Sequence, residues 1–163
     1  MINPGEIVLL GHSMGGLVAL NAAVILKERY PNIRVVTVFS PHEGSNLLNL
    51  KQFNDKSIMD NNFHPASPSF QAAAYATIAC TRFIAAKDHI IPQTKEELLG
   101  HKQDGHHVTE DGHNTYSSNA KTIERIKQQV LAGNIDGDSH IFCIHGLNGT
   151  PGGLYSLAKA IIS

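Results

Sequence analysis

The sequence predicts an α/β fold in which a mostly parallel sheet carries helices on both faces. Short apolar runs rich in Val, Ile and Leu alternate along the chain with longer segments of helical periodicity. This alternation is typical of a parallel sheet, because a strand that runs parallel to its neighbour needs a crossover, which is usually a helix. The chain has 163 residues, of which 42% are hydrophobic, so one domain over residues 1–163 with a sizeable core is expected.

The first three elements follow from their apolar patterns. The run from Glu6 to Leu10 predicts a buried strand, and the next segment, from Leu17 to about Tyr30, predicts a helix that Pro31 stops. A run of β-branched residues at 34–39 predicts the second strand. The helix positions expected in the core are Leu17, Leu20 and Val24.

The middle of the chain contains a long polar segment. From Asn46 to about Ser69 it is rich in Asn, Asp, Ser and Pro, and so long a connection inside a compact domain is usually functional. We therefore expect a lid-like insertion over residues 46–80, with helix near its end from residue 71. The run at 81–86 then predicts the third strand, which ends just before Asp88.

The rest of the chain continues the alternation. A short strand is expected at 107–109, and Ile123, Ile126 and Val130 mark one face of a helix that ends near Gly133. The further expected elements are a flexible joint at 134–139, a strand at 141–144 and a helix from about residue 153.

Composition excludes several classes of partner. Thirteen Lys and Arg residues nearly balance fourteen Asp and Glu residues, so no basic field favours nucleic acid or an anionic membrane. No apolar run approaches the ~18 residues of a membrane span, and the first residues lack the charged start of a signal peptide. We expect no stable membrane insertion and a cytoplasmic location. Cys80 and Cys143 lie in apolar surroundings and are expected to be buried, reduced thiols.

The segment Gly11-His12-Ser13-Met14-Gly15 is the most informative motif. It follows an apolar run and opens a helix, which is the context of a nucleophile elbow. A serine on so sharp a turn needs neighbours without a Cβ atom. Ser13 is therefore the expected nucleophile, and the alternative is that Ser13 is an ordinary helix N-cap.

A serine nucleophile needs a base, a carboxylate that orients the base, and donors for the oxyanion. Asp88 follows the third predicted strand, and His113 follows Gly112 shortly before a helix, so these two are the expected acid and base. Asp88 has an alternative role as the cap of a turn. The competing acids are Asp104, Glu110 and Asp111, and the competing bases are His106 and His107.

The order Ser13, Asp88, His113 resembles that of the α/β-hydrolase superfamily, in which serine, acid and histidine follow one another along the chain. The segment 87–92 resembles the acid loop of that family, and Gly112-His113 resembles its histidine loop.

Two further segments resemble lipases and carboxylesterases. Residues 40–45 are similar to the Thr-Pro-His-x-Gly-Ser segment of bacterial lipases, and residues 145–149 are similar to the His-Gly turn that supplies an oxyanion-hole amide. The resemblance implies that the backbone N–H groups of Met14 and Leu147 hold the oxyanion. It also implies supporting or substrate-binding roles for His12, His42, His145 and Gly146.

The order of segments departs from the family, because the His-Gly strand here comes last rather than before the elbow. In the family's own numbering, the expected sheet order is 3-5-6-7-8, a permuted core that lacks some strands. The joint at 134–139 and its flanks can cross the sheet, since eight extended residues reach ~26 Å and four strand spacings are ~19 Å. The His-Gly strand would lie near an edge, which favours a homodimer.

The function predicted from these residues is a serine hydrolase that cleaves small carboxylic esters, with lipid-like acyl esters preferred and no cofactor or metal required. A thioesterase or acyltransferase would use the same groups. The competitor from another class is a catalytically incompetent hydrolase-like binding or scaffold domain. A metal-dependent hydrolase is the weakest alternative, because the spacing of His101, His106, His107 and His113 matches no familiar ligand motif.

Overall fold

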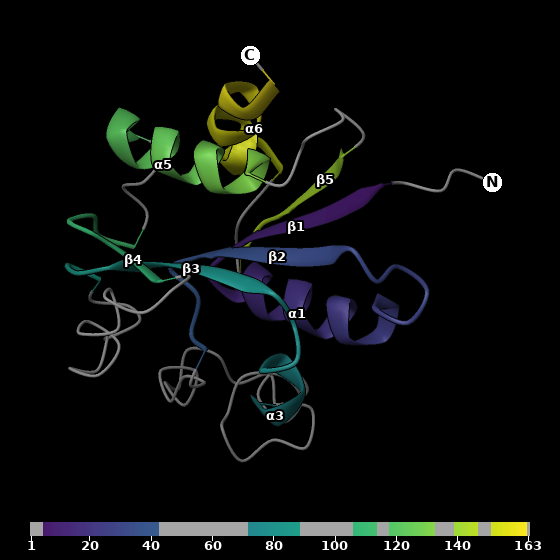
Figure 1. Ribbon diagram of the computed structural model, residues 1–163. Helices are drawn as coiled ribbons and strands as arrows, with labels where there is room; N and C mark the ends of the chain where they lie inside the picture. The colour runs from purple at the N-terminus through teal and green to yellow at the C-terminus, as the bar shows by residue number, and fades with distance from the viewer. Residues whose placement is uncertain are drawn as a thin grey trace.

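Five parallel strands form the sheet, in the order β4-β3-β2-β1-β5 (Figure 1). The computed structural model describes residues 5–42, 72–88, 106–113, 118–132, 139–146 and 151–162. The strands are β1 (Glu6–His12), β2 (Ile33–Val38), β3 (Cys80–Ala85), β4 (His106–Thr109) and β5 (Ser139–Ile144). The predicted α/β class and the predicted strand order are both confirmed, with the last strand beside the first.

Helices cover both faces of the sheet (Figure 1). They are α1 (Met14–Leu26), α3 (Ala72–Tyr75), α5 (Ala120–Leu131) and α6 (Tyr155–Ile162), and the 3-10 turn η5 (Pro151–Leu154) leads into α6. Helices α1 and α3 lie on one face, where the Tyr75 hydroxyl donates to Asn21 Oδ1 at 2.7 Å. Helices α5 and α6 lie together on the opposite face. None of the described helices is long and apolar enough to cross a membrane.

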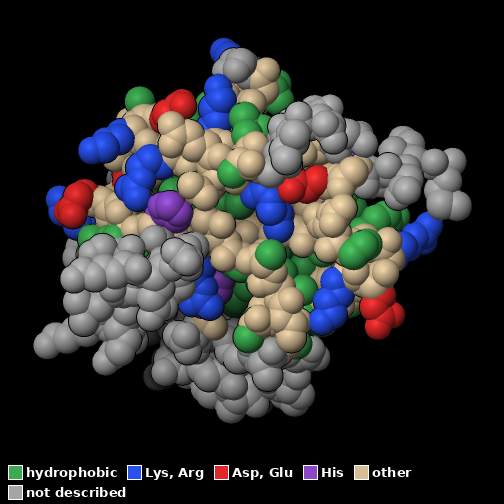
Figure 2. Space-filling model, viewed as in Figure 1, with side chains coloured by type: hydrophobic (Ala, Val, Ile, Leu, Met, Phe, Trp, Pro, Cys, Tyr) green, Lys and Arg blue, Asp and Glu red, His purple; other side chains and the backbone are tan. Residues whose placement is uncertain are grey.

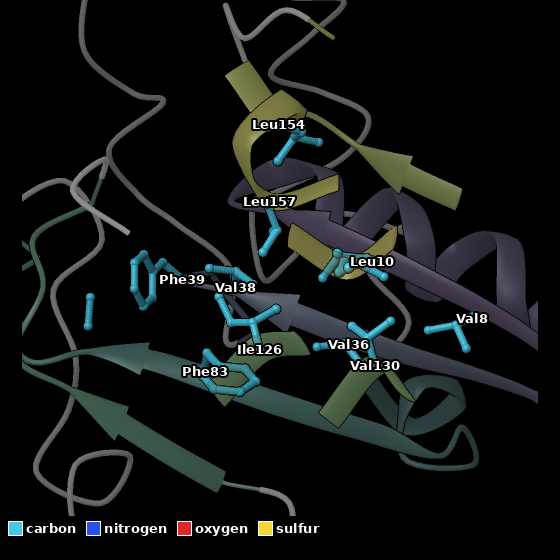
Figure 3. Close-up of a cluster of buried hydrophobic side chains, with 12 residues drawn as sticks. Val8, Leu10, Val36, Val38, Phe39, Phe83, Ile126, Val130, Leu154 and Leu157 are labelled. Atoms are coloured by element: carbon cyan, nitrogen blue, oxygen red, sulfur yellow. The ribbon is translucent and has the colours of Figure 1, made fainter. Parts of the chain in front are cut away.

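The core consists of two apolar layers, one on each side of the sheet. Successive side chains of a strand point to opposite faces, so Val8 and Leu10 contact the α5 and α6 layer while Ile7 and Leu9 contact the α1 layer. Figure 3 shows the first of these layers, where Ile126 of α5 meets side chains of the sheet. Because β1 is covered from both sides, its sequence is one apolar run rather than an alternating pattern.

Element boundaries differ from the prediction at α1 and α3. Helix α1 begins at Met14 rather than at Leu17, and it ends at Leu26 rather than near Tyr30. Within the described part of the helix expected at 71–80, which starts at residue 72, only Ala72–Tyr75 is helical, and Cys80 already belongs to β3. Ser139, expected in the joint, begins β5. Residues 46–71 of the predicted insertion and 134–138 of the joint lie outside the described residues.

The expected burial of Cys143 is wrong. Cys143 is exposed, as is the neighbouring Phe142, whose exposed fraction is 54%. Among the described strands, β5 is at the end of the sheet and pairs only with β1, so its side chains have fewer neighbours than those of β2. Cys80, in contrast, is half-buried, and burial raises the pKa of its thiol to about 11. Both cysteines are free thiols.

Charged side chains of both signs are interspersed on the face seen in Figure 2. One ion pair lies deeper, between β1 and β2. Arg34 Nε lies 3.1 Å from Glu6 Oε2, and its Nη1 donates to Gln129 O at 2.8 Å. Arg34 Nη2 donates both to Glu6 Oε1 and to Val130 O, and Ser139 Oγ donates to Glu6 Oε1 at 3.0 Å. These contacts join β1, β2, β5 and the last turn of α5.

Burial by itself would raise the pKa of Glu6, but the hydrogen bonds and charge of Arg34, together with the Ser139 hydroxyl, outweigh it and hold this pKa below its ordinary value. The Glu6 carboxylate is therefore ionised at neutral pH, and the guanidinium hydrogen bonds are charge-assisted.

Replacement of Arg34 by Ala is expected to lower the free energy of unfolding by about 2 kcal/mol, because Glu6 and two carbonyls of α5 lose their donors at once. Urea unfolding at pH 7 measures the change. Arg29→Ala is the matched control, since Arg29 is exposed and lies over the Tyr30 ring at 5.5 Å. Equal stability of the two variants would contradict the assigned role of Arg34.

Candidate active site

Ser13 occupies the turn between β1 and α1. His12 ends the strand, Met14 begins the helix, and Ser13 between them has φ 53° and ψ −125°. A non-glycine residue in such a conformation costs about 1–3 kcal/mol, so surrounding contacts must hold it. One of these is the hydrogen bond from Ser13 N to Val38 O at 2.8 Å. The backbone thus presents Ser13 at the carboxyl end of the sheet.

The interpretation of Ser13 as an ordinary N-cap is wrong. Its side chain makes no capping hydrogen bond to α1. At the start of α5, in contrast, Asn119 Oδ1 accepts from Lys121 N at 3.2 Å and Thr122 N at 3.4 Å. The Ser13 hydroxyl is therefore not used by the backbone of the helix that follows it.

Asp88 and His113 meet through a short hydrogen bond. His113 Nδ1 lies 2.7 Å from Asp88 Oδ2, and the exposed fractions of the two side chains are only 9% and 0%. The loops that carry them run together, because Ala86 N donates to Thr109 O and Lys87 N donates to Asp111 O. An ionised carboxylate only accepts hydrogen bonds. Nδ1 of His113 is therefore the donor in this hydrogen bond, which leaves Nε2 as the ring nitrogen that can accept a proton.

The competing acids contact other groups. Asp111 is buried and accepts from Thr122 Oγ1 at 2.6 Å and from Asn119 Nδ2 at 2.9 Å, which ties the histidine loop to the start of α5. Glu110 is exposed and lies 3.8 Å from the Lys87 ammonium group. Asp104 lies outside the described residues.

Of the competing bases, His107 stacks on the Phe83 ring with centroids 4.9 Å apart. His106 belongs to β4, and His101 lies outside the described residues. Within the described part of the chain, no three His, Cys, Asp or Glu side chains form a group able to hold a metal ion.

His12 connects the elbow to the histidine loop. Its Nε2 lies 2.9 Å from His113 O, and the two imidazole centroids are 5.1 Å apart. Ser13 and His113 consequently lie at the same end of the sheet. Among the described residues no hydrogen bond joins Ser13 Oγ to the His113 ring.

Burial lowers the pKa of His12, and the nearby His113 acts in the same direction. The hydrogen bond to His113 O and the charge of Asp88 act in the opposite direction but do not cancel the effect. His12 is therefore neutral at neutral pH.

The turn after β5 lies directly against the elbow. A Cβ atom on Gly146 would be 3.0 Å from both His12 O and Ser13 Cβ, and 3.6 Å from Met14 N. Met14 N–H belongs to the first turn of α1, where backbone donors have no partner within the helix. The exposed His145 holds this turn through Nδ1, 2.9 Å from Gly146 O. Leu147 lies outside the described residues.

His42, which was expected to have a supporting or substrate-binding role, contacts the strand that precedes it. Its Nε2 lies 2.6 Å from the buried Thr37 Oγ1, so it fastens the segment after β2 to the strand itself. Sequence reasoning missed Thr37 as this partner and did not foresee the contact of His12 with His113. No local pattern marks the second contact, because 101 residues separate the two positions.

Replacement of Gly15 by Ala is expected to move the turn after β5 away from the turn that carries Ser13. The added Cβ would be 2.3 Å from Ile144 O and 2.6 Å from His145 O, which are both backbone atoms. We expect the free energy of unfolding to fall by about 1–3 kcal/mol in urea unfolding. We also expect the rate at which a fluorophosphonate labels Ser13 to fall at least about tenfold. Gly153→Ala, at an exposed position of η5, is the control. Wild-type stability and reactivity in Gly15→Ala would refute this packing.

The lowered pKa of His12 predicts how stability depends on pH. An unfolded histidine takes up a proton near pH 6.5, whereas folded His12 resists it. Its contribution to stability is therefore complete above pH 6.5 and is lost as pH falls through the folded-state pKa. Urea unfolding at pH 8 and pH 5.5 should show a larger loss for the wild type than for His12→Gln. The same loss in both proteins would contradict this prediction.

Comparison with known protein families places part of the chain. Residues 2–67 match the family model described as "PGAP1-like alpha/beta domain", a segment that includes β1, the Ser13 turn, α1 and β2. No curated protein and no solved structure matches the chain. The segment that carries the Ser13 turn is therefore similar in sequence to PGAP1-like alpha/beta domains.

Proposed function

We propose that the protein is a serine hydrolase that cleaves carboxylic esters through an acyl-enzyme intermediate. The observation that carries this proposal is the buried hydrogen bond between His113 and Asp88, 2.7 Å long, at the end of the sheet where Ser13 occupies a strained turn. The likeness of residues 2–67 to a PGAP1-like alpha/beta domain supports the same reaction class.

In the acylation step, Ser13 Oγ forms a bond to the acyl carbon while His113 Nε2 takes the hydroxyl proton. Asp88 holds the Nδ1–H of the ring and stabilises the imidazolium that forms. The negative charge goes to the carbonyl oxygen, for which the backbone N–H groups of Met14 and Leu147 are the proposed donors. When the tetrahedral intermediate collapses, the bond to the alcohol oxygen breaks and His113 returns the proton to it.

Deacylation repeats these steps with water. His113 Nε2 takes a proton from water, the hydroxide oxygen bonds to the acyl carbon, and the acid leaves as Ser13 recovers its proton. The arrangement of β5 beside β1, with Gly146 against Ser13, supports a permuted core in which the C-terminal turn serves the N-terminal nucleophile.

The preference for lipid-like acyl esters rests on two sequence features, the segment 40–45 and the polar insertion from residue 46. Thioester hydrolysis and acyl transfer to an alcohol need the same groups. A panel of esters and thioesters of graded chain length, assayed with and without an alcohol acceptor, separates these activities.

A hydrolase-like binding domain is the second candidate. The observation that favours it is the lack of a hydrogen bond between Ser13 and His113 within the described residues. Labelling with a fluorophosphonate distinguishes the two candidates, because the reagent reacts with an activated serine and requires no knowledge of the natural substrate.

Incubation of the wild-type chain with a fluorophosphonate is expected to give one covalent adduct by intact mass, with a bond from Ser13 Oγ to phosphorus and loss of fluoride. Ser13→Ala should give none, and Asp88→Asn should label about 10²- to 10⁴-fold more slowly, because the imidazole loses its orienting carboxylate.

Ser156→Ala, at an exposed serine of α6, should label like the wild type. A chelator should not change the rate if the reaction depends on Ser13 rather than on a metal. Absence of an adduct on folded wild-type protein would overturn the hydrolase and leave the binding domain.

A further inference from the structure

In the proposed reaction His113, which follows β4, has to reach Ser13, which follows β1. Strands β3 and β2 separate β4 from β1, a distance of ~14 Å at the usual strand spacing. The loop after β4 must therefore cross the ends of two strands before His113 reaches Ser13. Asp88 follows β3, so its hydrogen bond anchors the imidazole only to the nearer part of this path.

His12 provides an anchor on the far side. It ends β1, its exposed fraction is 9%, and its Nε2 lies 2.9 Å from the backbone oxygen of His113. A carbonyl oxygen only accepts, so Nε2 of His12 must be the protonated nitrogen. The His12 ring also meets the Phe39 ring edge to face at 6.3 Å, which restricts its orientation.

We propose that His12 is a positioning residue for the base of the reaction, because its Nε2–H fixes the His113 backbone to the residue that directly precedes the nucleophile. This inference rests on the proposed function. His113 is then held at two points, its side chain by Asp88 and its backbone by His12. Since His12 and Ser13 are covalently adjacent, the second bond sets the distance from nucleophile to base.

Charge explains why a neutral donor suits this position. His113 becomes an imidazolium during acylation, and the His12 ring lies 5.1 Å from it. Among the described groups that face His12 are the His113 ring, the Asp88 carboxylate and the apolar Phe39 ring. Burial keeps His12 neutral, so it donates the bond without placing a second positive charge beside the first.

The test uses two substitutions of different chemistry. His12→Leu removes the donor and keeps an apolar volume, whereas the amide nitrogen of His12→Gln can occupy the position of Nε2 and donate. With a soluble p-nitrophenyl ester, His12→Leu is expected to lower kcat about 10- to 100-fold with KM within about twofold of the wild type. His12→Gln should recover most of kcat. His140→Gln, near the start of β5 at the opposite end of the sheet, is the matched control.

Fluorophosphonate labelling separates positioning from folding. Misplacement of the base should slow labelling while every folded molecule is still labelled, whereas a folding defect should reduce the final fraction that is labelled. Circular dichroism and thermal unfolding of each variant identify misfolded protein. An independent measurement, the ¹⁵N spectrum of the imidazoles, should show His12 as the Nε2–H tautomer.

The outcomes distinguish the two proposals. Wild-type kcat in His12→Leu, or equal losses in folded Leu and Gln variants, would overturn the role of His12 and leave the serine mechanism intact. An Nδ1–H tautomer of His12 would overturn it without reference to activity. A folded wild-type protein that neither labels nor hydrolyses would overturn both proposals.

Discussion

The turn between β1 and α1 leaves almost no space around its backbone, and the arrangement of the molecule depends on that closeness. At Gly11 a Cβ atom would lie 2.4 Å from the carbonyl oxygen of Gly15, and at Gly15 it would lie 2.3 Å from that of Ile144. Because Gly11 lacks a Cβ atom, α1 can begin immediately after the strand. Because Gly15 lacks one as well, the end of β5 can approach the same turn. This close packing of backbone helps to hold Ser13 in a conformation that an L-residue rarely adopts.

The burial of each segment explains which parts of the fold could be predicted from the sequence. Strands β1 and β2 are covered on both faces, so their apolar runs were sufficient to identify them. The start of α1 was missed because glycines at 15 and 16 have low helix propensity, whereas in the folded chain both are buried against neighbouring segments. Tertiary packing outweighs local preference there.

The site was predictable only in part, for a similar reason. The glycine-flanked motif led to Ser13, and positions after predicted strands, together with the resemblance to α/β-hydrolases, led to Asp88 and His113, since the carboxyl ends of parallel strands meet at one edge of the sheet. The carboxylate of Asp111 was a competitor of Asp88 in the sequence, and the structure shows that Asp111 accepts hydrogen bonds from the side chains of Thr122 and Asn119 instead. The exposure of Cys143 follows from the position of β5 at the end of the described sheet, so the apolar neighbours of Cys143 in the sequence were a poorer guide to its burial than the predicted edge position of its strand.

The pairing of the first strand with the last has a consequence for synthesis. Ser13 is translated before β5, which lies against its turn, and β5 follows every other described strand along the chain. Pairing of segments so distant in sequence forms late, because loop closure opposes it until the intervening chain has folded. A nascent chain would therefore hold Ser13 without the neighbouring turn until β5 and the turn after it have been translated.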